Sequence, residues 1–436
     1  MGRACHTVDV ACGPLRDTSE VVAVTKPTDR LGPDYRRLLA GAAASNLGDG
    51  LRMSALPLLA VSLTDDPVLV AGVTAAVVAP AILFGPAGGV VVDRFPRRSL
   101  IVAGQLLRAA AVAMFVAVLL SGRMTIAGVY VLAVVLGVGE VVVDGASQAA
   151  VPTLVPRRLL ARANARMVSA QLVLDQVVGN ALGALLYSVR VSLPFVVDGV
   201  SYLIGAGAAA QISVPLLPDT RPGREKRSMW HDAREGFAFL RRSPLLSPLL
   251  ASIGTYNLAM ATGNSVIVLL VVDVLDAPEA SFGLVLGVAS IAGFGTSLIV
   301  ERLLDRVGRR AVFIGAGVGE TVALAATGMA PNLAIVVVSV ALSSACTVAM
   351  RIPGRSVRQE VTPVRLLGRV ASSFRAVGLA GIPVGAVLGG LLTRTSNARA
   401  AFVAASVLAT IATVLLVRAT MHLPPINGGE GSSRYD

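Results

Sequence analysis

Long, continuous apolar runs recur along almost the whole chain, and they limit its possible folds more than any other feature. Each run holds about 20 residues or more, which is enough for one helix to cross the hydrocarbon core of a bilayer. The runs do not alternate with polar residues, so they predict helices rather than the strands of a membrane barrel. The sequence therefore predicts an all-α membrane protein with twelve transmembrane helices, at roughly 37–62, 68–92, 99–121, 126–151, 160–188, 192–216, 245–272, 281–300, 311–330, 333–352, 366–392 and 399–418.

The placement of charge predicts an orientation in the membrane. Only 15% of the 436 residues are charged, whereas a soluble protein carries roughly 25%. The net charge of +12 comes from Arg and Lys in the tails and in alternate loops, which is the positive-inside pattern. We therefore expect both termini to be cytoplasmic and the protein to lie in the plasma membrane. Because aromatic residues are not interleaved with these cations, we expect no nucleic-acid partner.

Residues that could support enzyme chemistry are sparse. The three cysteines and three histidines are scattered, without the spacing of a metal site or a disulfide framework. No nucleophile–base arrangement and no phosphate-binding glycine loop is present. We therefore expect no enzymatic activity and no cofactor, and an ion gradient rather than a nucleotide as the source of energy.

A short charged segment occurs twice between apolar runs. Gly88–Arg98 reads GGVVVDRFPRR, and Glu301–Arg310 reads ERLLDRVGRR; their aspartates, Asp93 and Asp305, are 212 residues apart. These segments resemble the loops between helices 2 and 3 and between helices 8 and 9 of major facilitator superfamily transporters. The resemblance implies two pseudo-symmetric six-helix halves and a cytoplasmic conformational latch formed by Gly89, Asp93, Arg94, Arg97, Arg98, Asp305, Arg309 and Arg310. For the arginines, a simple role as membrane-surface anchors is the alternative.

A second repeat supports two related halves, and two further segments indicate which branch of the superfamily the chain resembles. PRRLLAR at 156–162 matches PVRLLGR at 363–369 at nearly the same offset. SNLGDG at 45–50 and DGASQAAVPTLVP at 144–156 are similar to the macrolide-type and enterobactin-type exporter branch. The glycine pattern typical of drug/proton antiporters is only partly kept at 179–184, and a closer version lies at 381–390. We expect those small residues to let helices approach closely.

The resemblance divides the chain into five parts. The two tails are polar, and the segment between the halves carries many arginines. The predicted division is a disordered cytoplasmic tail at 1–35, a six-helix half at 36–217, a cytoplasmic linker at 218–243, a second half at 244–418 and a tail at 419–436.

Ionisable side chains within the apolar runs are costly to bury and are therefore candidate functional residues. Asp49 and Arg52 lie three residues apart in one predicted helix, where they can form an ion pair or take part in proton coupling. Glu140 and Asp144 share one face of another helix, and two close carboxylates in low dielectric raise each other's affinity for a proton. An alternative role for Asp144 is to anchor arginines of the adjacent loop.

Other polar residues within the runs can contact a substrate. Asp175 and Asn180 lie in the fifth predicted helix, and Asn257 lies in the seventh. Asparagines also hold membrane helices together, which is the alternative for both of them. Glu320 is a lone acid in the ninth predicted helix, and the sequence assigns it no role.

These residues and the resemblance together predict a secondary active transporter. We expect it to export amphipathic drugs or secondary metabolites by proton antiport with alternating access, and so to confer multidrug resistance. The expected partners are a small-molecule substrate, protons and membrane lipids, and the expected state is a monomer. The alternatives are an exporter of siderophores or other metabolites, a facilitator without proton coupling, and a membrane receptor that keeps the fold without transport.

Overall fold

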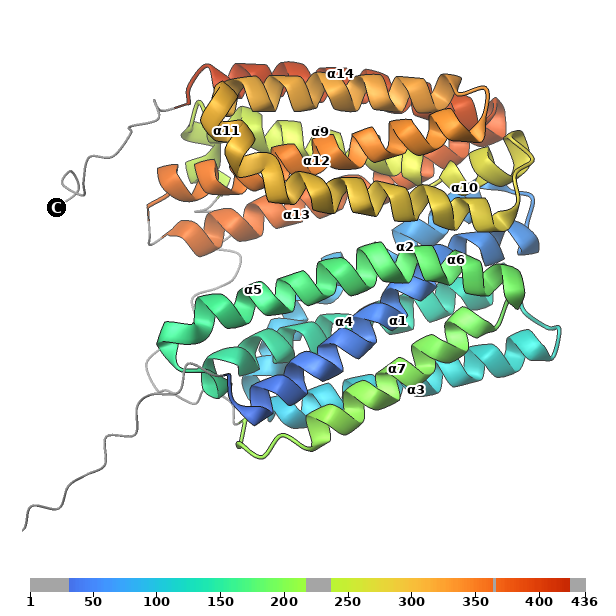
Figure 1. Ribbon diagram of the computed structural model, residues 1–436, viewed down its shortest axis with the longest axis vertical. Coiled ribbons are helices and arrows are strands. Elements are labelled where there is room, and N and C mark those ends of the chain that lie inside the picture. Colours follow the sequence, from blue (N-terminus) through green and yellow to red (C-terminus); the bar gives the residue numbers. More distant parts are fainter. Residues whose placement is uncertain (1–30, 217–236, 364–365, 424–436) are drawn as a thin grey trace, which may run out of the picture.

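The computed structural model describes residues 31–216, 237–363 and 366–423, and these residues form long helices joined by short turns. Figure 1 shows the helices running roughly antiparallel, with the earlier and the later helices of the chain in two adjoining groups. In the first group lie α1 (Pro33–Leu63), α2 (Pro67–Arg94), α3 (Arg97–Leu120), α4 (Ile126–Leu154), α5 (Leu160–Gln171), α6 (Asn180–Val189) and α7 (Leu193–Ala210), with a short 3-10 turn, η1 (Arg157–Leu159), before α5 and a π-helical stretch, η2 (Leu172–Gly179), between α5 and α6. In the second group lie α9 (Leu246–Asn264), α10 (Ile267–Leu269), α11 (Glu279–Met329), α12 (Leu333–Val361), α13 (Leu367–Thr395) and α14 (Ala398–Thr420), with a second π-helical stretch, η3 (Leu270–Val274), after α10.

Helix starts follow ordinary capping chemistry. The Asp66 carboxylate accepts a hydrogen bond from the Val68 N–H at 2.9 Å at the start of α2. Asn332 and Asn397 cap α12 and α14 in the same way, at 3.1 and 3.0 Å. Each side-chain oxygen satisfies a backbone N–H that has no partner within its own helix. The turns between helices can therefore be short.

Within the described residues, ten helical stretches are long and apolar enough to cross a membrane. The α1 helix is not among these ten, because its polar residues lower its hydropathy. The predicted spans 281–300 and 311–330 both lie in α11, which has 51 residues. This helix breaks at Gly308, where φ is +81° and ψ is 158°. Glycine adopts positive φ without the steric cost of a side chain, and Figure 1 shows α11 reversing direction in its middle.

The two repeated charged segments are more helical than we predicted. We expected helices to end near 92 and to begin near 99, with a loop between them, and a second loop at 301–310, but α2 continues to Arg94 and α3 already begins at Arg97. In the second copy only Gly308 departs from helical geometry. The charged side chains therefore project mainly from helix ends. Most of the predicted tails, at 1–30 and 424–436, and most of the predicted linker lie outside the described residues. The predicted tail bounds of 35 and 419 are wrong, because α1 already begins at Pro33 and α14 continues to Thr420.

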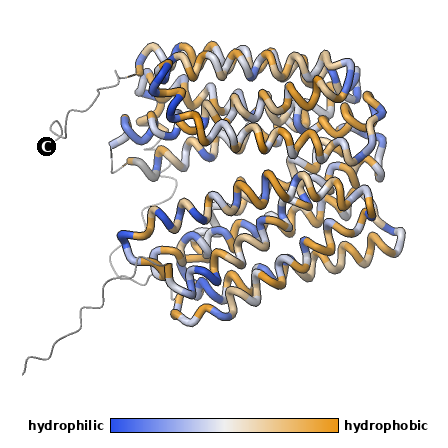
Figure 2. Tube along the Cα trace, viewed as in Figure 1, coloured by the Kyte–Doolittle hydropathy of each residue, from blue (hydrophilic) through white to orange (hydrophobic). Residues whose placement is uncertain are grey.

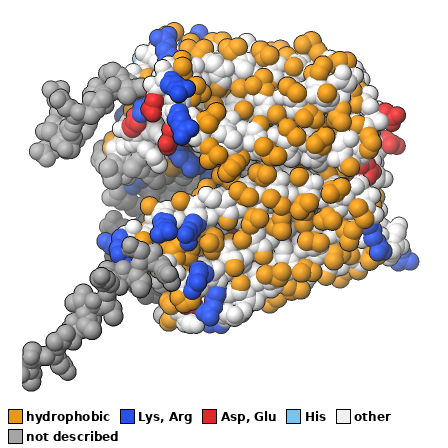
Figure 3. Space-filling view, viewed as in Figure 1, with side chains coloured by type: hydrophobic (Ala, Val, Ile, Leu, Met, Phe, Trp, Pro, Cys, Tyr) orange, Lys and Arg blue, Asp and Glu red, His pale blue; other side chains and the backbone are white. Residues whose placement is uncertain are grey.

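The outer surface of the molecule is apolar along the helices and polar at their ends. Figure 2 shows hydrophobic residues along most of each helix and hydrophilic residues near the turns. Large apolar side chains such as Leu83, Met114 and Leu298 are more than half exposed. In Figure 3 most of the visible arginines lie at one end, together with some acidic residues, and further acidic residues with a few arginines lie at the other. This surface suits a lipid environment bounded by two polar interfaces.

Glycines let several helices cross at backbone contact, as we expected of the small residues. A Cβ on Gly179 would lie 2.7 Å from the Cα of Gly50, so η2 rests directly on α1. Gly385 and Gly389 bring α13 equally close to α9, where an added Cβ would lie 2.3 and 2.2 Å from backbone oxygens. The helices that carry polar residues are thereby held at fixed separations.

Candidate functional site: a buried charge network beside two carboxylates

The first group of helices buries a network of charged side chains at its centre. Asp49 of α1 accepts hydrogen bonds from Arg52 at 2.7 Å, from Arg108 of α3 at 2.5 Å and from the Tyr202 hydroxyl of α7 at 2.7 Å. Asp198 of α7 pairs with the Arg52 Nε at 3.4 Å. Two carboxylates thus balance two guanidinium groups, and the predicted Asp49–Arg52 ion pair is confirmed.

The network is deeply buried and closely packed. The side chains of Arg52, Arg108 and Asp198 are 2%, 1% and 0% exposed, and Asp49 retains 14%. The Arg108 guanidinium also lies 4.0 Å from the centre of the Tyr202 ring, in a cation–π contact. Charges buried to this depth are stable only while they are paired.

Glycines make the space that the network needs. A Cβ on Gly139 of α4 would lie 2.7 Å from the Arg108 Cγ, and a Cβ on Gly48 would lie 2.5 Å from an Asp198 oxygen. Neither position can hold a larger residue without moving a buried charge. The packing of α1, α3, α4 and α7 therefore depends on glycines that leave space for the four charged side chains of the network, Asp49, Arg52, Arg108 and Asp198.

Sequence reasoning did not single out Arg108, Asp198 or Tyr202. The first two could have been found, because each is an ionisable residue within an apolar run. Tyr202 gave no such signal, since its role depends on a contact with Asp49, a residue 153 positions away.

The two acids of α4 lie beside this network. Glu140 is half-buried and close enough to Arg52 and Arg108 for its charge to act on both guanidinium groups. Asp144, one turn further along α4, is exposed and feels the charge of Arg375 on α13. Among the residues that the structure describes, no ion pair joins Asp144 to an arginine. The α4 acids therefore lie between the buried network and the second group of helices.

The remaining predicted polar residues have different surroundings. Asp175 is half-buried within the π-helical η2, and its carbonyl oxygen packs against Gly50. The Asn180 side chain bonds back to the Gln176 carbonyl at 3.1 Å within its own span. Asn257 of α9 donates to the Gly378 carbonyl of α13 at 3.0 Å, so it joins two helices as the alternative reading expected.

The predicted latch residues lie near helix ends and make unequal contacts. Arg98 donates to the Ala210 carbonyl of α7, and Arg97 donates to the Thr153 hydroxyl of α4 at 3.3 Å. Arg309 forms a two-bonded ion pair with Glu360 of α12, at 2.6 and 2.7 Å. By contrast, Asp93 and Asp305 are exposed, and neither has a hydrogen-bonding partner among the described residues.

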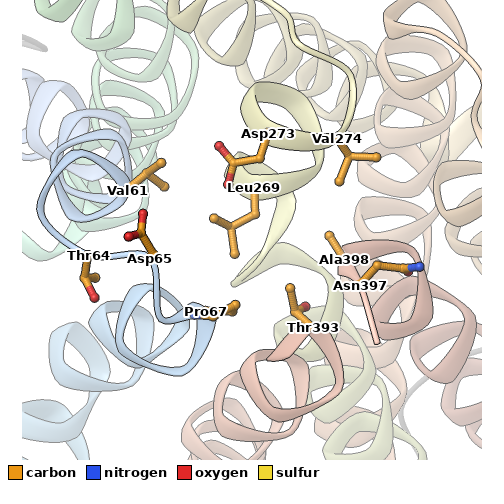
Figure 4. A pocket seen from close by; sticks show the side chains of 10 residues that line it. All are labelled: Val61, Thr64, Asp65, Pro67, Leu269, Asp273, Val274, Thr393, Asn397 and Ala398. Atoms are coloured by element: carbon orange, nitrogen blue, oxygen red, sulfur yellow. The ribbon is translucent and has the colours of Figure 1, made fainter. Parts of the chain in front are cut away.

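A cavity of about 300 Å³ lies between the two groups of helices at the end opposite the arginine-rich one. Figure 4 shows Asp65, from the turn before α2, and Asp273, from η3, on opposite sides of it. Asp66, the residue after Asp65, forms a long ion pair with Arg394 of α13, with 3.8 Å between a carboxylate oxygen and a guanidinium nitrogen. No cluster of His, Cys, Asp or Glu that could hold a metal ion occurs in the described parts of the chain.

Comparison with known proteins decides the family. A model of the family described as transmembrane secretion effector, a branch of the major facilitator superfamily, matches residues 33–434. The chain belongs to this family. It is therefore a multi-pass membrane transporter of the major facilitator type, and the resemblance seen in its sequence is confirmed.

Individual relatives agree with this assignment. The transporter is 28% identical over 407 residues to a major facilitator-type transporter of Sinorhizobium fredii, covering 90% of this chain and 95% of the relative. It is 27% identical over 256 residues to macrolide efflux protein A of Streptococcus pyogenes, covering 52% of this chain and 63% of that protein.

Solved structures share the fold. A bacterial homologue of the iron transporter ferroportin in its inward-facing state gives a TM-score of 0.70 at 17% identity, covering 89% of this chain and 98% of that one. A bacterial homologue of ferroportin in an outward-facing state gives a TM-score of 0.58 at 18% identity, covering 89% of this chain and 100% of that one. The nucleoside transporter NupG, as a D323A mutant, gives 0.71 at 12% identity, covering 89% and 99%.

Proposed function

We propose that this transporter is a secondary active exporter of amphipathic drugs or secondary metabolites, driven by proton antiport. In this proposal the chain has twelve membrane spans in two halves, with α11 supplying two spans on either side of Gly308. Export is supported by the similarity to macrolide efflux protein A over half of the chain. We propose that both termini lie in the cytoplasm; this is supported by the arginine-rich helix ends, which lie on the side where the described chain begins and ends.

The structure fits an inward-facing state in this scheme. At the end away from the arginines, Gly390 of α13 packs on α2, where a Cβ would lie 2.8 Å from the Val68 Cα. Gly283 of α11 packs on α6 in the same way, with an added Cβ 2.7 Å from that of Ala184. The higher TM-score with the inward-facing ferroportin homologue also supports this state. Alternating access then requires these glycine contacts to separate.

The observation that carries the coupling proposal is the position of Glu140. It lies next to the paired network of Asp49, Arg52 and Arg108, but it has no ion pair of its own among the described residues. A mid-span acid beside fixed cations can release a proton when those cations are near and bind one when the helices move apart. Asp144 and Asp175 supply further acids on the same route, with Asn180 and Asn257 as polar contacts.

We assign the latch role to the charged helix ends. Arg97, Arg98 and Arg309 hold neighbouring helices in the present state through the contacts described above. Asp93 and Asp305 are free to engage when the arginine-rich end closes, and Arg94, Arg310 and Gly89 lie on the same helix ends. A small-molecule substrate, protons and lipids are the proposed partners, and the proposed state is a monomer.

Dye transport in inverted membrane vesicles tests the proposal. We expect ethidium to accumulate when a pH gradient is imposed, and we expect Glu140→Gln to abolish this accumulation. Glu301→Gln, which changes an exposed acid on α11, is the matched control and should transport normally. Equal transport by Glu140→Gln would move the coupling role to Asp49 or Asp175. No transport by folded wild-type protein would favour a narrow metabolite exporter or a receptor.

A further inference from the structure

Glu320 of α11 is a fully buried acid that the proposed mechanism does not use. Its side chain is 0% exposed and is held by two hydroxyl groups of α12. Ser343 donates to one carboxyl oxygen at 2.7 Å, and Thr347 donates to the other at 3.3 Å. The neighbouring Gly319 lets α12 come this close, because a Cβ there would lie 2.7 Å from the Cys346 sulfur.

No cation among the described residues balances this carboxyl group. Within residues 31–216, 237–363 and 366–423, no Lys or Arg forms an ion pair with Glu320. The titratable groups close enough to feel its charge are Tyr256 of α9 and Cys346 of α12, and the Tyr256 hydroxyl is bonded to Thr413 of α14 at 2.6 Å. An unpaired carboxylate in such surroundings is far less stable than the neutral acid, so Glu320 needs a bound proton.

By the sequence repeats, Glu320 occupies a position equivalent to that of a residue in the charge network of the first group of helices. The offset of 212 residues that relates Asp93 to Asp305 also relates Arg108 to Glu320. The offset of 207 that relates Pro156 to Pro363 also relates Glu140 to Thr347. At corresponding positions, one group of helices buries a cation among acids and the other buries an acid among hydroxyls.

We propose that Glu320, Ser343 and Thr347 form a second proton-binding site in the later group of helices. The carboxylate takes up one proton to become the neutral acid and releases it when α11 and α12 shift; this role in the cycle rests on the proposed function. Hydroxyl groups suit such a site, because they can donate to the carboxylate and accept from the acid. Thr347, unlike Glu320, is only half-buried, so the site is less enclosed on the side of this hydroxyl.

Chemical labelling tests this site without any transport. Dicyclohexylcarbodiimide adds to protonated carboxyl groups in apolar surroundings, and peptide mass spectrometry identifies the modified residue. The full-length transporter in lipid nanodiscs is labelled at intervals from about pH 5 to about pH 9. We expect Glu320 to be modified at low pH and its labelling to fall about tenfold per pH unit once the acid ionises. The Glu320→Gln variant must lose the label on that peptide.

A second variant separates proton binding from a structural role. Thr347→Val keeps the side-chain shape but removes one hydroxyl that stabilises the carboxylate, so labelling of Glu320 should persist to higher pH. The proposal is overturned if Glu320 stays unlabelled while Asp144 in the same sample is modified, or if its labelling does not change with pH. Because export is not needed here, a lack of ethidium transport would count against drug export and leave this result standing.

Discussion

Replacing Asp49 with asparagine should destabilise the transporter strongly, because Asp49 is the shared partner of two buried arginines. Asparagine has nearly the same shape but no charge. In Asp49→Asn, Arg52 would keep one ion-pair partner, Asp198, and Arg108 would lose the carboxylate with which it is paired, in surroundings where the two arginines are 2% and 1% exposed. Breaking a buried ion pair in this way costs about 3–5 kcal/mol. We expect a loss of that size in the free energy of unfolding.

The assay is denaturant unfolding of the protein in lipid nanodiscs, with two comparisons. Asp144→Asn, which removes an exposed acid without an ion pair, should change the free energy of unfolding by only about 0.5 kcal/mol. The double variant Asp49→Asn with Arg108→Gln restores charge balance, so its loss should be smaller than the sum of the two single losses by at least about 1 kcal/mol. The reasoning is refuted if Asp49→Asn is as stable as the wild type, or if the two losses simply add.

Two further predictions concern the helix contacts. Gly390→Val should separate the helices at the end away from the arginines, because a Cβ there would lie 2.8 Å from the Val68 Cα and overpacking costs about 1–3 kcal/mol. Spin-label distances across that end should lengthen. The control Gly295→Ala should leave them unchanged, because a Cβ on Gly295 would meet nothing within 4 Å. Glu360→Gln should lower the free energy of unfolding by less than about 1 kcal/mol, because the side chains of Arg309 and Glu360 are 24% and 43% exposed. A larger loss in denaturant unfolding would contradict this, because it would show that the ion pair stabilises the fold strongly.

The fold could be predicted from the sequence because the membrane requirement is simple. Length and continuous apolarity place most of the helices within a few residues of their observed limits. The helical character of 301–310 could not be read in this way, because those charged residues lie at a helix end outside the apolar run. The reversal there depends on one backbone angle at Gly308, which hydropathy does not report.

The site was only partly predictable. Spacings of three and four residues put side chains on one face of a helix, so the sequence predicts two pairs, Asp49 with Arg52 and Glu140 with Asp144. The contacts that fix the network join α1 to α3 and α7 across 59 and 153 residues, and helical periodicity carries no information on such distances. The closeness of α13 to α2 at Gly390 is likewise a property of packing between helices that are far apart in sequence.

The central claim, export driven by a proton gradient, is tested most directly by ethidium accumulation in inverted vesicles that contain the wild-type protein. The gradient is imposed first and then collapsed with nigericin, which exchanges protons for potassium. The account predicts accumulation above that of vesicles without the protein and its prompt loss when the gradient collapses. Accumulation that continues unchanged after nigericin would contradict it.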